Sequence, residues 1–439
     1  MPLFPRRQFL TGLGALAANV RKGDAAVTSR VAALQNSAQA CIFVNLGGAP
    51  SHVDTFDFKA GSWTPGDASP QQGAGGIVLS RTLFPQLSRI TGDLCLLRSI
   101  ESWEAAHERG QFYLQTAHSS NPAFNVETPH IGAVVALEKG GGKFPPFLAL
   151  NGPVSQGSAF LGGQVEPVAA PASQYGFSTL EHAYYGEHSQ NRFEQLYRML
   201  QEMDSVRSSP YDKLLADHSA YYDTAKRLMY DQTIAGVFKM TDEERGRYGD
   251  SPFGRACIVA RNAVRAANGV RFISLSQEGW DTHQGMFDRG YIDSSSRNLY
   301  VLANELDRGI GALAADLKAS GHFASTLIVM MGEFGRTPGP LNGRGGRDHH
   351  KLAMCAAMLG GGVRGGRVIG ATDKNGERIV TPGWKQNRQI YIEDIAATIY
   401  SALGIDYTKV VTDTPSGRRF EYVSTNQIDP AVITEVFGS

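Results

Sequence analysis

The stretch "ACIFVNLGGAPSHVDTFD", residues 40–57, joins a short apolar run to an abrupt Gly47-Gly48 break. A continuous apolar run that stops at glycines is typical of a strand buried on both faces of a parallel sheet. His52 and Asp54 follow within a few residues of the break. The stretch therefore predicts an α/β fold with polar chemistry at the carboxyl end of an early strand.

Further apolar runs alternate with amphipathic segments along the chain. We expect strands within residues 94–100, 144–150, 270–276, 325–332 and 351–362, and helices within 103–117, 254–269, 298–321 and 390–405. Such alternation predicts an α/β fold with a mostly parallel central sheet, flanked by helices on both faces. Residues 151–180 are rich in turns, and about 181–240 have helical spacing, which suggests a helical insertion. We therefore expect a single domain over residues 38–439.

The composition of the chain limits its partners. The 439 residues carry 42 Lys+Arg against 42 Asp+Glu and contain no long basic run, so no nucleic acid is expected as a partner. The four cysteines are scattered without a CxxC pair, and Cys41, Cys95 and Cys355 lie in apolar runs. Buried thiols are the simplest interpretation, and they do not indicate a redox compartment.

The N-terminus resembles a twin-arginine signal. Arg6-Arg7 precede Phe9-Leu10 and a mildly apolar stretch rich in Gly and Ala, within a segment that we place at residues 1–30. The resemblance implies the twin-arginine export machinery as a partner of the precursor, and a periplasmic or otherwise exported protein. The alternative is a cytosolic N-terminus that happens to contain two arginines. No stretch reaches transmembrane length, so no integral membrane segment is expected in the mature protein.

Carboxylates and imidazoles gather where the expected strands end. In open α/β sheets, ligands bind at the carboxyl ends of the strands, so these side chains are expected to meet at one edge. Carboxylate and imidazole suit Zn, Mn or Fe, and carboxylates alone would suit Ca, so we predict one or two divalent ions. The candidate metal ligands are Asp54, Asp281, His283, Glu333, Asp348, His349 and His350. Arg336 and Arg347 are candidates to bind substrate oxyanions, and Arg336 also to assist catalysis.

Each candidate also has a purely structural interpretation. Asp54 follows a Gly-Gly turn and would equally well cap a helix. Glu333 and Arg336 would pair with each other, as loop charges often do. Adjacent histidines usually point in different directions, so one of His349 and His350 is expected as a ligand. The site hypothesis depends on all four loops converging.

The order of these motifs resembles the alkaline phosphatase/sulfatase/phosphoglycerate mutase superfamily. More closely, "GWDTH", "EFGRTP" and "GRDHH" resemble an uncharacterised branch of twin-arginine-exported, sulfatase-like proteins, over about residues 38–405. The resemblance implies an alkaline-phosphatase-like fold and a metal site that includes Asp54, the Asp281–His283 pair, Glu333 and a late histidine. Phe334 departs from the pattern, because the superfamily usually has a histidine there.

The nucleophile is the second departure. The helix within "SIESWEAAHERGQFYLQTA" resembles the one that carries the superfamily's nucleophile, and His107 falls at that position. His107 is thus a candidate ligand, acid/base or nucleophile, with Ser102 as a nearby hydroxyl. The sulfatase signature C-x-P-S-R is absent from the sequence.

The resemblance implies an exported, metal-dependent hydrolase whose substrate is a small-molecule or glycan phosphate or sulfate ester. The alternative is a catalytically degenerate, metal-binding envelope protein that acts in binding or assembly, since the usual nucleophile and one usual histidine are missing. Fold alone does not decide between the two.

Overall fold

The computed structural model describes residues 34–152, 154–170, 172, 189–205, 219, 232–266, 269–293 and 296–438. The predicted signal segment and most of the predicted helical insertion lie outside the described residues. Of that insertion, the structure describes helices α3 (Ser189–Ser205) and α5 (Gln232–Phe238).

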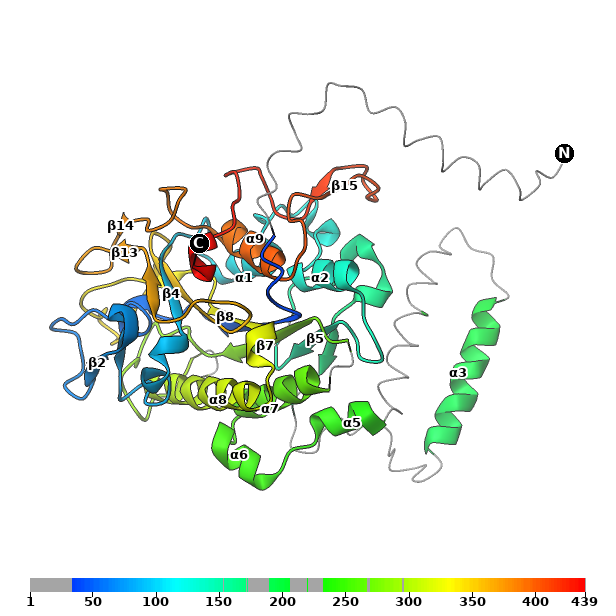
Figure 1. Ribbon diagram of the computed structural model, residues 1–439, viewed down its shortest axis with the longest axis horizontal. Coiled ribbons are helices and arrows are strands. Elements are labelled where there is room, and N and C mark those ends of the chain that lie inside the picture. Colours follow the sequence, from blue (N-terminus) through cyan, green and yellow to red (C-terminus); the bar gives the residue numbers. More distant parts are fainter. Residues whose placement is uncertain are drawn as a thin grey trace, which may run out of the picture. The chain divides into compact units, whose positions relative to one another are not determined.

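Within the described residues, eight strands form one sheet in the order β12-β4-β11-β8-β1-β7-β5-β6 (Figure 1). Their bounds are β1 Ala40–Gly47, β4 Cys95–Ile100, β5 Phe147–Leu150, β6 Val168–Ala170, β7 Phe272–Glu278, β8 Thr326–Met331, β11 Met354–Leu359 and β12 Arg367–Ile369. β1 lies between β7 and β8 and is parallel to both, with Cys41 opposite Phe272 and Leu327. Every residue of β1 is buried, including the polar Asn45, as its largely apolar run predicts.

The sheet is mostly parallel, as predicted. β11 is the exception, since it runs antiparallel to both β4 and β8. Its direction brings the segment before Met354 to the edge where β1, β7 and β8 end. The short strands β6 and β12 are not evident from the sequence. β6 falls in a stretch that we predicted to be irregular, and three-residue strands leave too little periodicity to detect.

Helices cover both faces of the sheet. The side chains of Ile42, Val44 and Leu46 pack into a core with helices α7 (Pro252–Arg265) and α8 (Leu299–Ala319). Cys41 and Phe43 point the other way, into a core with α1 (His107–Thr116), α2 (Ile131–Lys139) and α9 (Ile392–Ala402). The alternation along one central strand thus builds two apolar layers, and the α/β prediction is confirmed.

The helix boundaries follow local chemistry. Asn298 caps α8 by accepting a hydrogen bond from the Val301 amide at 3.1 Å. Ser251 caps α7, and Pro252 occupies its first turn, where no amide donor is required. Among the helices of the described residues, none has the length and apolar character that a bilayer crossing requires.

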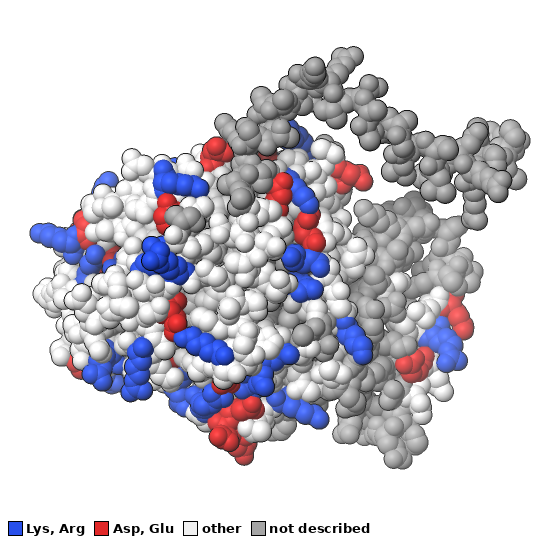
Figure 2. Space-filling model, viewed as in Figure 1, with Lys and Arg blue, Asp and Glu red and all other residues white. Residues whose placement is uncertain are grey.

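The four cysteines are buried as free thiols, which confirms the interpretation of Cys41, Cys95 and Cys355. On the face drawn in Figure 2, basic and acidic side chains lie interspersed between uncharged ones.

Candidate metal centre

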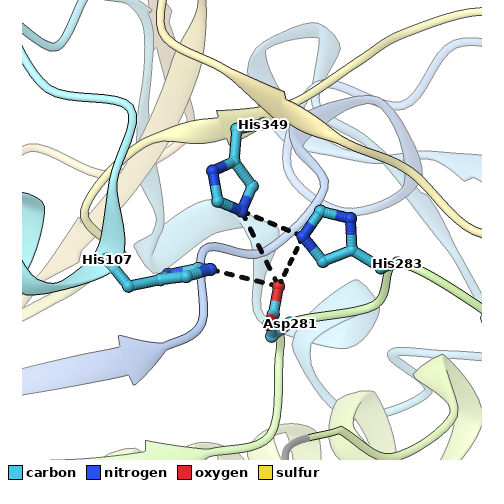
Figure 3. Close-up of side chains that lie close together, drawn as sticks. All are labelled: His107, Asp281, His283 and His349. Carbon is cyan, nitrogen blue, oxygen red and sulfur yellow. Dashed lines mark hydrogen bonds and ion pairs between the residues drawn. The ribbon is translucent and has the colours of Figure 1, made fainter.

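Three imidazoles and one carboxylate converge at the edge of the sheet where β1, β7 and β8 end. One nitrogen or oxygen from each of His107, Asp281, His283 and His349 lies within 4.8 Å of all the others (Figure 3). Asp281 Oδ1 is at the centre, 3.1 Å from His107 Nε2, 3.2 Å from His283 Nε2 and 3.9 Å from His349 Nε2. His283 Nε2 and His349 Nε2 are 3.0 Å apart. These four residues lie far apart in the sequence, yet one nitrogen or oxygen of each faces the same small volume.

Each imidazole is held from behind through its other nitrogen. The three Nδ1 atoms lie 2.7 Å from Glu333 Oε1 for His107, 2.8 Å from Asp348 Oδ1 for His283, and 2.6 Å from the Ala105 carbonyl for His349. These oxygens only accept hydrogen bonds, so each Nδ1 carries the proton and donates it. Each Nε2 then faces the centre, which is how metal-binding histidines are usually oriented.

The Gly47-Gly48 break packs against the loop that carries Asp281. Gly48 has φ +102, and a Cβ there would lie 2.4 Å from the Asp281 amide nitrogen. The Gly48 amide donates to Glu333 Oε1 at 3.2 Å. The turn that ends β1 thus requires glycine, because it positions both a ligand loop and the carboxylate behind His107.

A short hairpin carries the fourth ligand. Strand β9 (Gly335–Arg336) pairs antiparallel with β10 (His349–His350), and His349 lies opposite Arg336. The Phe334 ring, 5.0 Å from the His107 ring and 4.7 Å from the His349 ring, packs against both. Where the superfamily usually has a histidine, Phe334 therefore supplies an apolar contact to His107 and His349 instead of a further nitrogen.

The cluster is rich in ionisable groups. Asp281, Glu333 and Asp348 each contact an imidazole, while Arg336 is paired with Asp281 and Arg344 lies 3.9 Å from Asp348. Burial lowers the pKa of His107, but its hydrogen bonds to Asp281 and Glu333 outweigh burial and raise that pKa to about 9. Burial would raise the pKa of Asp281, but the bonds to His107 and Arg336 hold it well below its usual range. His107 therefore holds a proton near neutral pH, and a metal ion that binds its Nε2 must displace that proton.

The donor set fits a divalent transition metal. Three imidazole nitrogens and one carboxylate oxygen suit Zn, Mn or Fe, whereas Ca prefers oxygen ligands alone. The exposed fractions of the side chains are 32% for His107, 24% for Asp281, 28% for His283 and 26% for His349. One side of the cluster is therefore open to solvent, as a catalytic rather than a purely structural site requires.

Asp54 lies outside this cluster. Its Oδ2 accepts hydrogen bonds from Arg347 Nε at 2.7 Å and from Ser51 Oγ at 2.5 Å. Arg347 is fully buried and also donates to the carbonyls of Thr337 and Gly339. The structure thus gives Asp54 a cationic side chain as its partner. In the part of the chain that the structure describes, the cluster around Asp281 is the one group of three or more such side chains close enough to hold an ion.

Arg336 lies beneath the cluster, with no exposed surface. Its guanidinium donates to the carbonyls of Gly48, Ala49 and Arg347, and it contacts Asp281 and His283. This arrangement positions the ligand loop. A direct contact of Arg336 or Arg347 with substrate stays a prediction, and both guanidinium groups already have partners within the chain.

The remaining candidates, His350 and Ser102, also lie outside the cluster. His350 points away from the cluster, with Nε2 2.9 Å from the Glu377 carbonyl and its ring stacked on His52. Only His349 of the pair joins the site, as the usual divergence of adjacent side chains predicted. Ser102 is buried, and its Oγ accepts a hydrogen bond from the Glu104 amide.

Sequence reasoning missed the Ala105 carbonyl that holds His349. A backbone carbonyl leaves no signature in a side-chain pattern, so no sequence signal was available. For His107, the position in the motif pointed to the site but left its role open, and the structure places it in the cluster with Asp281, His283 and His349.

The family-model comparison agrees with the expected resemblance to an uncharacterised family. A family model described as "Protein of unknown function (DUF1501)" matches residues 38–437. No protein of curated function matches the sequence. The solved structures that match include a sulfatase from Pseudoalteromonas sp., with 14% identity, 84% of this chain and 68% of that chain covered, and a TM-score of 0.40. They also include a phosphonate monoester hydrolase from Silicibacter pomeroyi (15%, 92%, 77% and 0.38) and an alkaline phosphatase from the Antarctic bacterium TAB5 (13%, 84%, 99% and 0.35).

Proposed function

We propose that this chain, which belongs to the DUF1501 family of proteins of unknown function, is a hydrolase of phosphate or sulfate esters that depends on a single divalent metal ion. The observation that carries the proposal is the convergence of three Nε2 atoms on Asp281 Oδ1, at a solvent-accessible edge of the sheet. The order of the motifs, which resembles that of the alkaline phosphatase and sulfatase superfamily, supports the choice of ester.

A bound divalent ion would supply Lewis-acid polarisation of an ester oxygen at this position. The chain's own residues prepare the place. Glu333 and Asp348 accept hydrogen bonds from the Nδ1 atoms of His107 and His283. They thereby hold each ring with its Nε2 toward the centre. Arg336 fixes Asp281 from below, and the backbone carbonyls around Arg336 prevent that guanidinium from moving away.

Export is part of the proposal. The arginine pair and the Phe-Leu that follow it support transport of a folded, metal-loaded precursor through the twin-arginine pathway. A fusion of residues 1–30 to a reporter would test this prediction. Export that depends on both arginines supports it, and a cytosolic reporter contradicts it.

The proposed activity is tested by metal analysis of the purified protein, followed by hydrolysis of nitrophenyl phosphate, a phosphodiester and nitrophenyl sulfate. We expect about one metal ion per chain and metal-dependent turnover of at least one ester. His349→Ala is expected to lose both metal and turnover. His350→Ala is the matched control, because it removes an adjacent imidazole that points away from the cluster.

If the protein binds stoichiometric metal, hydrolyses none of these esters and is unaffected by chelation, the catalytically degenerate envelope protein would be favoured instead. Absence of metal from protein loaded with Zn, Mn and Fe would contradict both readings.

A further inference from the structure

A crevice of about 340 Å³ lies beside the metal centre, at the carboxyl ends of β5 and β7. Its lining includes Asn151, Phe253, Gln277, Glu278, Arg297 and Glu305. Pockets of this size commonly hold small-molecule ligands, and the carboxyl edge of an α/β sheet is where they bind. The proposed hydrolysis makes no use of these side chains.

Gln277 gives the crevice a buried acceptor. The side chain is 2% exposed, and its Nε2 donates to the Leu302 carbonyl at 2.9 Å and to Glu305 Oε2 at 3.3 Å. Both of those partners only accept, so the amide orientation is determined and Oε1 faces the other way. Oε1 has no hydrogen-bond partner among the described residues. A buried carbonyl oxygen without a donor is costly, and Gln277 is among the residues that line the crevice.

The charges of the crevice are unbalanced. Glu278, Asp293 and Glu305 bring three carboxylates, and Arg297 brings one guanidinium, which binds Glu305 Oε1 at 2.8 Å. Among the described residues, the Glu278 carboxylate has no ion-pair partner; burial, with the nearby Glu333 charge, raises its pKa. The lining therefore offers more acceptors than donors and a net negative charge.

The crevice is directly linked to the metal centre. Glu278 ends β7, and Asp281 follows after two intervening residues. The Glu278 carboxylate packs against Gly47, where a Cβ would lie 2.1 Å from Oε2. The next residue, Gly48, donates to Glu333, which holds His107. Glu278 thus lies between the crevice and the loop that carries Asp281.

A metal ion does not suit the crevice. Within the described residues, its carboxylates do not form a group whose oxygens lie close enough to coordinate one ion, unlike the cluster around Asp281. Acceptors spread along a cavity fit an organic cation with several N–H donors better than a point charge.

We propose that this crevice binds a protonated amine on the alcohol part of the substrate, so that the preferred ester is one of an amino alcohol or amino sugar. This inference rests on the proposed hydrolase function, but the binding of the amine itself does not require turnover.

The test uses the full-length, metal-loaded protein and two matched esters, 2-aminoethyl phosphate and propyl phosphate, which differ in the ammonium group. We expect a KM about tenfold lower for the amine, the effect of one charge-assisted hydrogen bond. Glu278→Gln should remove this preference. Glu243→Gln, which removes an exposed carboxylate on helix α6 (Asp242–Tyr248), is the control and should keep the preference.

A second measurement is independent of activity. Ethanolamine binding, followed by calorimetry, should be detectable in the parent protein and the control, and weakened at least fivefold in Glu278→Gln. Binding of ethanolamine without hydrolysis of either ester would contradict the hydrolase proposal and support the crevice. Equal KM values for the two esters, or 1-propanol binding as well as ethanolamine, would overturn the crevice proposal while leaving the hydrolase in place.

Discussion

Replacing Glu333 by glutamine should weaken metal binding without removing any ligand. Glu333 is fully buried, and its Oε1 accepts from His107 Nδ1 at 2.7 Å and from the Gly48 amide at 3.2 Å. Its Oε2 accepts from Gln111 Nε2 at 2.8 Å. All of these partners donate. A glutamine can offer one oxygen, so its amide nitrogen must face a donor on one side or the other.

The size of the effect follows from these contacts. Losing the negative charge makes the His107 lone pair less basic, and the donor conflict loosens the ring. Changes to the group behind a ligating histidine cost about 10–100-fold in metal affinity, which is about 1.4–2.7 kcal/mol. Because Glu333 is shielded from water, we expect the upper half of that range.

Asp348→Asn provides a graded control. Asp348 has the same role behind His283, but its side chain is 54% exposed, so solvent screens its charge. We expect a loss of affinity of less than about tenfold. The assay is competition for Zn between the protein and a chromophoric chelator at fixed pH, with circular dichroism to confirm folding. An Asp348→Asn effect equal to or larger than that of Glu333→Gln, or unchanged affinity in both variants, would refute the idea that these carboxylates tune the site.

Three other perturbations test the fold and the site. Gly48→Ala should destabilise the protein by more than ~1 kcal/mol and reduce metal content, because of its φ of +102 and the close Asp281 amide; normal metal content in that variant would contradict this. Arg347→Met leaves the buried Asp54 carboxylate unpaired and should cost about 3–5 kcal/mol in urea unfolding, whereas a loss below 1 kcal/mol would show that Asp54 has another partner. Burial raises the pKa of Glu393 from 4.5 to about 7, so between these pH values the folded protein holds more protons than the unfolded chain, and stability falls as pH rises. Glu393→Gln should therefore stabilise the protein by up to about 3 kcal/mol at pH 8 and by little at pH 4; equal effects at both pH values would contradict the shift.

The sequence predicted the structure at positions where the residue type allows one local conformation or environment. The apolar run of β1 and the glycines that end it predicted a buried strand and a sharp turn, and Gly48 shows why no other residue would serve. Asp281 and His283 were found because they follow a strand at the edge where ligands gather. Long helices such as α8 were evident from their periodicity.

The sequence could not decide where charged side chains choose between partners. Asp54 had been weighed as a metal ligand or a helix cap, and the structure gives it Arg347 instead, a residue almost three hundred positions away. That pairing depends on how two loops pack, and neither loop carries a local signal for it. The antiparallel direction of β11 has the same origin, because strand direction is set by the path of the connecting chain.

The pairing of Asp54 with Arg347 also bears on the number of metal ions. Asp54, the further carboxylate that a second ion would need, is already neutralised by Arg347 in a pocket that excludes water. A second ion would have to displace that arginine and leave its charge buried without a partner, which costs several kcal/mol. The proposed hydrolysis is therefore expected to titrate with one equivalent of metal.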